Sequence, residues 1–243
     1  MVTPIYNTMK RIDRRLTEAA IDGGARFWQI VAHNSSGAVQ GPTWSFTTAA
    51  APPPPINEIV IYASDIPPAA LQGSWSLQSD GTSPNGTKLG TPDNGVANAS
   101  APLASPVHFF DVTFNADAGR TYTIWLRIKA LNNSKFNDAV WVQFANATVN
   151  GSPIYPIGTT SGLLVNLATD SSAVSLSGWG WANGAYWLSQ PATVVFPSGG
   201  QQTLRMQIRE DGVQIDQIVL SHTNYFNTAP GPPTNDSTIV PKP

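Results

Sequence analysis

Apolar residues recur at every second position in one segment of this chain after another, with no helical segment between them. In TYTIWLRIKA (121–130), Tyr122, Ile124, Leu126 and Ile128 alternate with the residues between them. The other strand-like segments are 58–64, 108–114, 139–145, 185–190, 192–197, 202–209 and 213–220. A period of two places neighbouring side chains on opposite faces of a strand. The pattern therefore predicts an all-β chain folded as an antiparallel β-sandwich.

A proline run marks the clearest domain boundary. The sequence AAAPPPP ends the first quarter of the chain, and proline runs form stiff, extended spacers. We therefore expect an Ala/Pro-rich linker at 49–57, the β-sandwich at 58–225 and a C-terminal tail at 226–243 that offers little core. Residues 1–24 are expected to form an N-terminal extension, with a short helix at 8–20 where apolar residues take helical spacing.

Residues 25–48 predict a β-hairpin. The text FWQIVAHNSSGAVQGPTWSFTT resembles the last two strands of a bacterial fibronectin type III domain, including Trp28, Trp44 and Phe46. The earlier strands of such a domain are absent, and Arg26 stands where its corner tyrosine is expected. A sandwich that lacks most of its strands leaves open edges and half a core. The hairpin is therefore expected to be a remnant left by truncation.

The composition favours an uncharged, hydroxylated partner. Charged residues make up only 12% of the 243 residues, and the formal net charge is -2, against about a quarter charged in ordinary soluble proteins. No basic face is available for a phosphate backbone, so no nucleic-acid partner is expected. The absence of cysteine excludes disulfides and thiolate metal sites. No segment has the length of a membrane span, and the N-terminus lacks the apolar core of a signal peptide, so an export signal would lie upstream.

The segment 58–240 resembles a galactose-binding-like jelly-roll domain, related to the carbohydrate-binding modules of bacterial extracellular proteins. The matching text is HFFDVTFNADAGRTYTIWLR, FNDAVWVQF, IGTTSGLLVNL, LSGWGWANGAYW, QTLRMQIREDGVQIDQIVL and PGPPTNDSTIV. The resemblance implies a jelly-roll sandwich that is a non-catalytic accessory module. It further implies a glycan or polysaccharide partner, neighbouring upstream domains and an extracellular or cell-surface location.

Aromatic residues beside Asn or Asp are the expected sugar site, because rings pack on the C–H face of a sugar and amides bind its hydroxyls. The densest cluster is GWGWANGAYW, which holds Trp179, Trp181, Asn183, Tyr186 and Trp187. A second interpretation remains open at this stage: the two tryptophans Trp179 and Trp181 fill the core of a helix-free domain instead of meeting a ligand.

Three further sets of residues are weaker candidates. The REDG loop supplies Glu210 and Asp211 beside Arg209, unless it is simply a charged turn. The LNNSKFND loop supplies Asn132 and Asn133, although asparagine is also a common turn former. Trp75 in GSWS either caps the edge of the core or is exposed.

No cofactor is expected, and a structural calcium is only weakly indicated. Related modules use acidic residues of the first strand and an Asp of the last one. Asp216 matches the latter, but YASD offers only Asp65 in the former, and calcium requires six to eight oxygen ligands.

Three functional classes remain open. The first is the carbohydrate-binding module, and the second is a spacer or adhesion domain without a small ligand. The third is a polysaccharide-degrading enzyme. No catalytic motif is present, so an enzyme would require Asp138 and Glu210 to face each other across a cleft.

Overall fold

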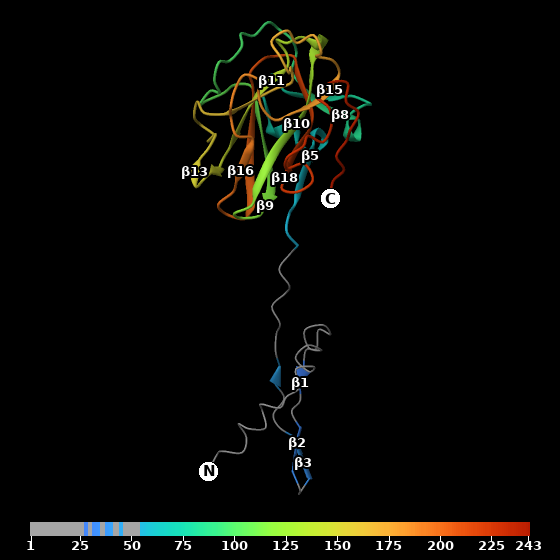
Figure 1. Cartoon of the computed structure of the whole chain (residues 1–243), viewed down its shortest axis with the longest axis vertical. Helices are drawn as coiled ribbons and strands as arrows, with labels where there is room; N and C mark the ends of the chain where they lie inside the picture. The colour runs from blue at the N-terminus through green and yellow to red at the C-terminus, as the bar shows by residue number, and fades with distance from the viewer. Residues whose placement is uncertain (1–26, 29–30, 35–36, 41–43, 46–53) are drawn as a thin grey trace. The chain divides into compact units, whose positions relative to one another are not determined.

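The computed structural model describes residues 27–28, 31–34, 37–40, 44–45 and 54–243 (Figure 1). The chain divides into two compact units, Met1–Pro54 and Pro55–Pro243. In the first unit, the described strands are paired: β1 with β4, and β2 with β3 in an antiparallel hairpin. Their bounds are β1 (Phe27–Trp28), β2 (Val31–Asn34), β3 (Gly37–Gln40) and β4 (Trp44–Ser45). The helix predicted at 8–20 lies outside the described residues.

The second unit is an all-β sandwich of two antiparallel sheets, as predicted (Figure 1). The larger sheet runs in the order β13-β12-β16-β10-β18-β8-β7, while β15 also pairs with β10 and β5 with β18. Its strands are β5 (Glu58–Tyr62), β7 (Ser76–Ser79), β8 (Thr87–Gly90), β10 (Thr121–Ala130), β12 (Thr148–Val149), β13 (Ser152–Pro153), β15 (Trp179–Ala182), β16 (Thr193–Val195) and β18 (Val213–Ser221).

The smaller sheet runs in the order β14-β11-β17-β9-β6. Its strands are β6 (Leu71–Gln72), β9 (Phe109–Ala116), β11 (Ala139–Phe144), β14 (Leu163–Asn166) and β17 (Gly200–Ile208). Four short 3₁₀ turns complete the described elements: η1 (Ala63–Asp65), η2 (Pro68–Ala70), η3 (Pro84–Gly86) and η4 (Leu131–Asn133).

The core lies between the two sheets and follows the alternation in the sequence. Tyr122, Ile124, Leu126 and Ile128 of β10 are all completely buried. Their side chains pack in one apolar cluster with residues of β9, β11, β17 and β18. Burial of this many large apolar side chains is the main source of the domain's stability, because each contributes roughly 1.5–3 kcal/mol relative to an exposed position.

The opposite face of β10 is also buried, and the C-terminal tail covers it. Trp125 and Trp181 form a second apolar cluster with Val240, which is only 3% exposed. The tail is fixed by backbone hydrogen bonds, including Asn235 N to the carbonyl of Ser177 (2.7 Å). The expectation that residues 226–243 offer little core is therefore wrong. The tail has the polar composition of a linker, yet it covers part of the outer face of the larger sheet.

Glycine allows the tail to lie close to β15. A Cβ atom on Gly180 would collide with the backbone carbonyl of Pro233 in the tail. The amide of the next residue, Trp181, donates a 3.1 Å hydrogen bond to the carbonyl of Pro232. The tail is thus packed backbone against backbone on this strand.

Candidate functional site

Three aromatic side chains are exposed within residues 54–243, and all three line one hollow. Phe136 is 61% exposed, Tyr186 48% and Trp187 45%. The hollow has a volume of about 240 Å³, and its other lining residues include Asn98, Lys135, Asp138, Asn166, Arg209 and Glu210. We call it the aromatic hollow. Large exposed rings are costly to leave in water, so their convergence marks this surface as a site of contact.

Adjacent ends of three antiparallel strands bring the polar residues together. Asp138 directly precedes β11, whose first residue pairs with Asn166 at the end of β14. Arg209 and Glu210 directly follow β17, which pairs with the other edge of β11. The sheet register therefore places one end of each strand at the same edge of the sandwich, although the residues lie far apart in sequence.

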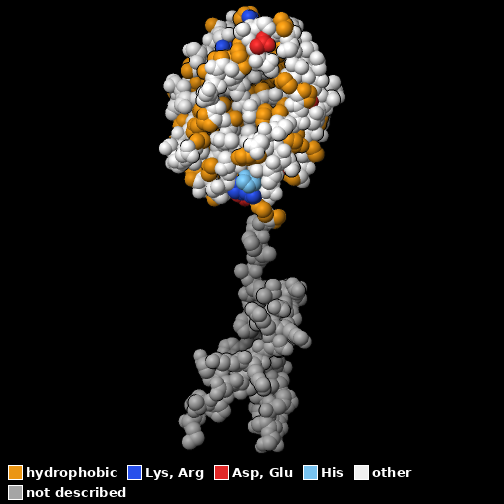
Figure 2. Space-filling model, in the orientation of Figure 1, with side chains coloured by type: hydrophobic (Ala, Val, Ile, Leu, Met, Phe, Trp, Pro, Cys, Tyr) orange, Lys and Arg blue, Asp and Glu red, His pale blue; other side chains and the backbone are white. Residues whose placement is uncertain are grey.

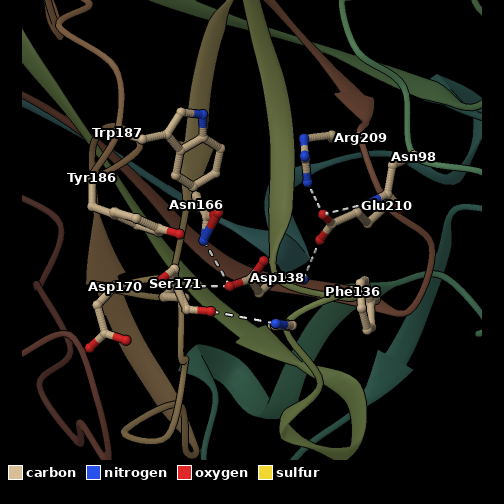
Figure 3. Close-up of a pocket in the computed structure, with 12 residues that line it drawn as sticks. Asn98, Phe136, Asp138, Asn166, Asp170, Ser171, Tyr186, Trp187, Arg209 and Glu210 are labelled. Carbon is tan, nitrogen blue, oxygen red and sulfur yellow. Dashed lines mark hydrogen bonds and ion pairs between the residues drawn. The ribbon is translucent and has the colours of Figure 1, made fainter.

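Loops carry the remaining walls of the hollow. Tyr186 and Trp187 lie on the loop between β15 and β16, and Asn98 lies on the loop before β9. In Figure 3, the two rings lie on one side, Arg209 and Glu210 lie on the other, and Asp138 is between them. Phe136 comes from the loop that precedes β11.

Glu210 is fully engaged by protein groups. It is 1% exposed, and its Oε2 accepts a 3.0 Å hydrogen bond from the backbone amide of Asp138. Its Oε1 accepts from the Asn98 side chain at 3.2 Å and forms an ion pair with Arg209. Glu210 therefore connects three segments of the wall. It also holds the side-chain amide of Asn98 and the guanidinium of Arg209 in defined positions.

Asp138 is buried in the wall of the hollow, and one of its carboxylate oxygens has no hydrogen-bond partner among the described residues. Its Oδ2 accepts hydrogen bonds from Asn166 Nδ2 (2.7 Å) and from the amide of Ala168 (2.9 Å). Its Oδ1 is buried and has no hydrogen-bond partner among the described residues. Burial raises the pKa of Asp138 to about 6, while those two hydrogen bonds and the charge of Arg209 act in the opposite direction.

The two neighbouring rings meet edge to face. The ring centroids of Tyr186 and Trp187 lie 4.5 Å apart with an interplanar angle of 74°. The guanidinium carbon of Arg209 lies 5.8 Å from the Trp187 ring, and Lys135 Nζ lies 5.6 Å from the Phe136 ring. Edge-to-face and cation–π contacts orient exposed rings without covering them. The site therefore offers rings for C–H faces and amides and charges for hydroxyl groups.

The predicted site residues differ in where the structure places them. Tyr186 and Glu210 line the aromatic hollow, and Asn183 lines a neighbouring one. Asp211 is buried, and its Oδ2 accepts hydrogen bonds from the amides of Asn94 (2.6 Å) and Val96 (3.1 Å). Asp211 therefore holds a surface loop in place and does not line the aromatic hollow.

Asn132 and Asn133 also lie outside the aromatic hollow. Both are exposed, and both have positive φ angles, of 59° and 51°. Asparagine tolerates this left-handed conformation better than most residues. The geometry agrees with the turn-forming interpretation of the two residues.

The tryptophans predicted as a ligand platform are buried. Trp75 is 4% exposed and packs edge to face on Phe110 at 5.0 Å. Trp179 is 4% exposed, and its Nε1 donates a 3.0 Å hydrogen bond to Thr82 Oγ1. Trp181 is 2% exposed within the cluster beneath the tail. A sugar cannot stack on rings that protein already covers, so the platform prediction for these three residues is not met.

Several residues of the hollow were not singled out from the sequence. Phe136 stands inside a loop that was noted only for its asparagines, and its signal was a large aromatic in an otherwise polar loop. Asn98 and Asn166 carry no local signal, because the sheet register and a long loop place them at the site. Trp187 belongs to the cluster singled out in the sequence, and it is the exposed tryptophan of that cluster.

The two carboxylates considered for calcium are both paired with basic side chains. Asp216 is completely buried and forms an ion pair with Arg127 (2.5 Å), which also pairs with Asp236 (3.0 Å). Asp65 is paired with Lys242 (2.6 Å). Within the described residues, no group of three or more His, Asp or Glu side chains is arranged to hold a metal ion. The residues present do not fit the expected calcium site.

Comparisons with known proteins give structural neighbours only. No protein-family model and no curated protein matches the sequence. The C-terminal CBM6 of a marine laminarinase from Zobellia galactanivorans is 12% identical, with a TM-score of 0.40 over 68% of this chain and 99% of that one. A family 35 carbohydrate-binding module from Clostridium thermocellum is 14% identical, with a TM-score of 0.37 over 67% and 98%.

A Paenibacillus xanthan lyase also matches, with 16% identity and a TM-score of 0.41 over 82% of this chain and 18% of the lyase. These similarities concern the fold alone. Among the described residues, no helix has the length and apolar character needed to cross a membrane.

Proposed function

We propose that the sandwich is a non-catalytic module that binds neutral polysaccharide at the aromatic hollow. The observation that carries the proposal is the convergence of Phe136, Tyr186 and Trp187, the three exposed aromatic side chains of residues 54–243, on one hollow. The rings meet the C–H faces of sugar units, and Asn98 and Asn166 with Arg209 bind hydroxyl groups. An accessory role in a secreted or surface protein follows from the resemblance described above.

The low charge of the protein as a whole supports an uncharged ligand. Few Lys, Arg, Asp or Glu side chains appear on the face seen in Figure 2. In the hollow itself, the charge of Glu210 is matched by Arg209. A neutral, hydroxylated ligand needs no compensating charge when it displaces water from such a surface.

The carboxylates support a binding role over catalysis. Glycosidases place two carboxyl groups on opposite sides of the scissile bond. Here the amide of Asp138 is hydrogen-bonded to Glu210, so the two residues belong to one continuous wall. Both oxygens of Glu210 already accept from protein donors, so its carboxylate is held as a structural support of the wall.

The direct experiment measures binding to a polysaccharide panel by affinity electrophoresis and by sedimentation with insoluble substrates. Laminarin, cellulose, mannan, galactan and xylan are suitable members of the panel. We expect at least one to bind and Trp187→Ala to weaken that binding roughly tenfold or more, because a large stacking surface is lost. Leu103→Ala is the control, because Leu103 is similarly exposed (53%) and lies outside the aromatic hollow.

Two results would contradict the proposal. The first is no binding to any member, and the second is equal weakening by both substitutions. Release of reducing ends during long incubation would instead identify an enzyme.

A second candidate function has its own observation. Val96, Leu103 and Val107 are exposed by 44–66% and border one apolar depression near β9. Such a patch is typical of a surface that meets a neighbouring domain, so a spacer or adhesion role is the alternative if the glycan panel fails.

A further inference from the structure

A second hollow lies directly beside the aromatic hollow. It has a volume of about 430 Å³, and the two hollows share Asn166, Ala168 and Tyr186. We call it the neutral hollow, because none of the residues that line it is charged. The aromatic hollow, by contrast, is lined by Lys135, Asp138, Asp170, Arg209 and Glu210 among others.

The neutral hollow combines apolar and hydrogen-bonding groups. Leu188 is 40% exposed at its edge, whereas Trp125 and Trp181, which border the hollow, are only 9% and 2% exposed and offer no open stacking face. Asn183 is half-buried there, and its side-chain amide forms no hydrogen bond with any other described residue. Because Asn183 is only half-buried, its amide is open to a ligand that enters the hollow.

The tail helps to form this second hollow. Pro233 lines it together with residues of β10 and β15. The same tail segment packs backbone against backbone on β15, with Pro232 accepting a 3.1 Å hydrogen bond from the amide of Trp181. The hollow is therefore built on fixed elements, as a specific binding site requires.

We propose that the glycan site is bipartite: Tyr186 separates two subsites, and the neutral hollow binds the next unit of the same neutral oligosaccharide. This inference rests on the proposed function and adds the length and the charge of the ligand. Tyr186 lines both hollows and packs edge to face with Trp187. An acidic sugar is disfavoured in the second subsite, because its charge would lose water without gaining a counter-charge.

Substitution of a glycine in the neutral hollow allows this subsite to be blocked without changing the aromatic hollow. A Cβ atom on Gly184 meets nothing within 4 Å, and its φ angle is not in the left-handed range. Gly184→Leu therefore adds an apolar side chain at the lining of the hollow with little strain on the fold. Gly81→Leu is the matched control, because Gly81 has the same open surroundings and lines neither hollow.

The experiment compares affinities for cello-, laminari- and manno-oligosaccharides of two and six units by isothermal titration calorimetry. In the unmodified protein and in Gly81→Leu, we expect the longer ligand to bind roughly fivefold tighter or more, which corresponds to about one added hydrogen bond. In Gly184→Leu, that gain from chain length should disappear. Asn183→Ala should reduce it in the same way.

The outcomes separate the two proposals. If affinity does not depend on length, or if Gly184→Leu retains the gain, the second subsite is overturned while the aromatic hollow remains supported by the loss in Trp187→Ala. If the protein binds none of these oligosaccharides and no polysaccharide of the panel, both proposals are overturned.

Discussion

The backbone amide of Asp138 donates a 3.0 Å hydrogen bond to Oε2 of Glu210, and this bond joins the start of β11 to the loop after β17. The two acidic residues are 72 positions apart in the chain. Both are about 1% exposed. The bond orders one wall of the aromatic hollow, so the carboxyl groups act first as structural supports of the site.

The raised pKa of Asp138 predicts a specific pH dependence of stability. Its pKa is about 6 in the folded protein against an ordinary value of 3.8, so between these values the folded state holds a proton that the unfolded state has lost. Asp138 therefore destabilises the fold increasingly as pH rises from about 4 to 6, and by a constant amount above that.

Asp138→Asn removes this titration. The amide oxygen can still accept from Asn166 and Ala168, while the NH₂ group replaces the oxygen that has no partner. We expect the stability of the variant relative to the unmodified protein to improve by about 2 kcal/mol between pH 4.5 and pH 7.5. Urea unfolding at the two pH values measures this difference. A constant difference would show that the pKa of Asp138 is not raised.

The ion pairs of Arg127 predict that the C-terminal tail is required for stability. Arg127 is completely buried and pairs with both Asp216 and Asp236. Asp236→Asn leaves the guanidinium with a single charged partner, and breaking a buried pair costs about 3–5 kcal/mol. Chemical unfolding should show a loss of about 3 kcal/mol. Asp65→Asn is the control, because its pair with Lys242 is partly exposed and should contribute less than about 1 kcal/mol. Equal small losses would contradict the account.

Gly180 and Gly184 are expected to respond differently to substitution by alanine. In Gly180→Ala the new methyl group would collide with the carbonyl of Pro233, whereas in Gly184→Ala it would meet nothing within 4 Å. We expect Gly180→Ala to destabilise the domain by roughly 1–3 kcal/mol, because the tail must move away from β15. Gly184→Ala should be close to neutral. Thermal unfolding distinguishes the two, and similar melting temperatures would show that the tail is not packed on Gly180 in solution.

The sequence predicted the fold well where the alternation of apolar residues along a strand determines which side chains are buried. Tyr122 and Ile128 were placed on the inner face of their strand by alternation, and both are completely buried. The same alternation assigned Trp125 and Arg127 to the outer face. It could not show that this face is buried, because the covering segment lies about 110 residues later and has the composition of a linker.

The site was predicted only in part, for a related reason. Aromatic density identified the segment that contains Tyr186 and Trp187, but density alone does not separate core rings from exposed ones. Trp179 and Trp181 lie on β15 beneath the tail, while Trp187 lies on the loop that follows. Asn166 reaches the hollow through the pairing of β14 with β11, and such long-range register is not visible in a local pattern.

The most direct test of the account uses the indole N–H signals of the tryptophans in a ¹H–¹⁵N spectrum during a titration with a bound oligosaccharide. Trp187 is exposed at the aromatic hollow, whereas Trp75 and Trp179 are buried. The Trp187 signal should shift with increasing ligand, and the signals of Trp75 and Trp179 should stay in place. A bound glycan that leaves the Trp187 signal unchanged, or that shifts Trp75 or Trp179 instead, would contradict the location of the site.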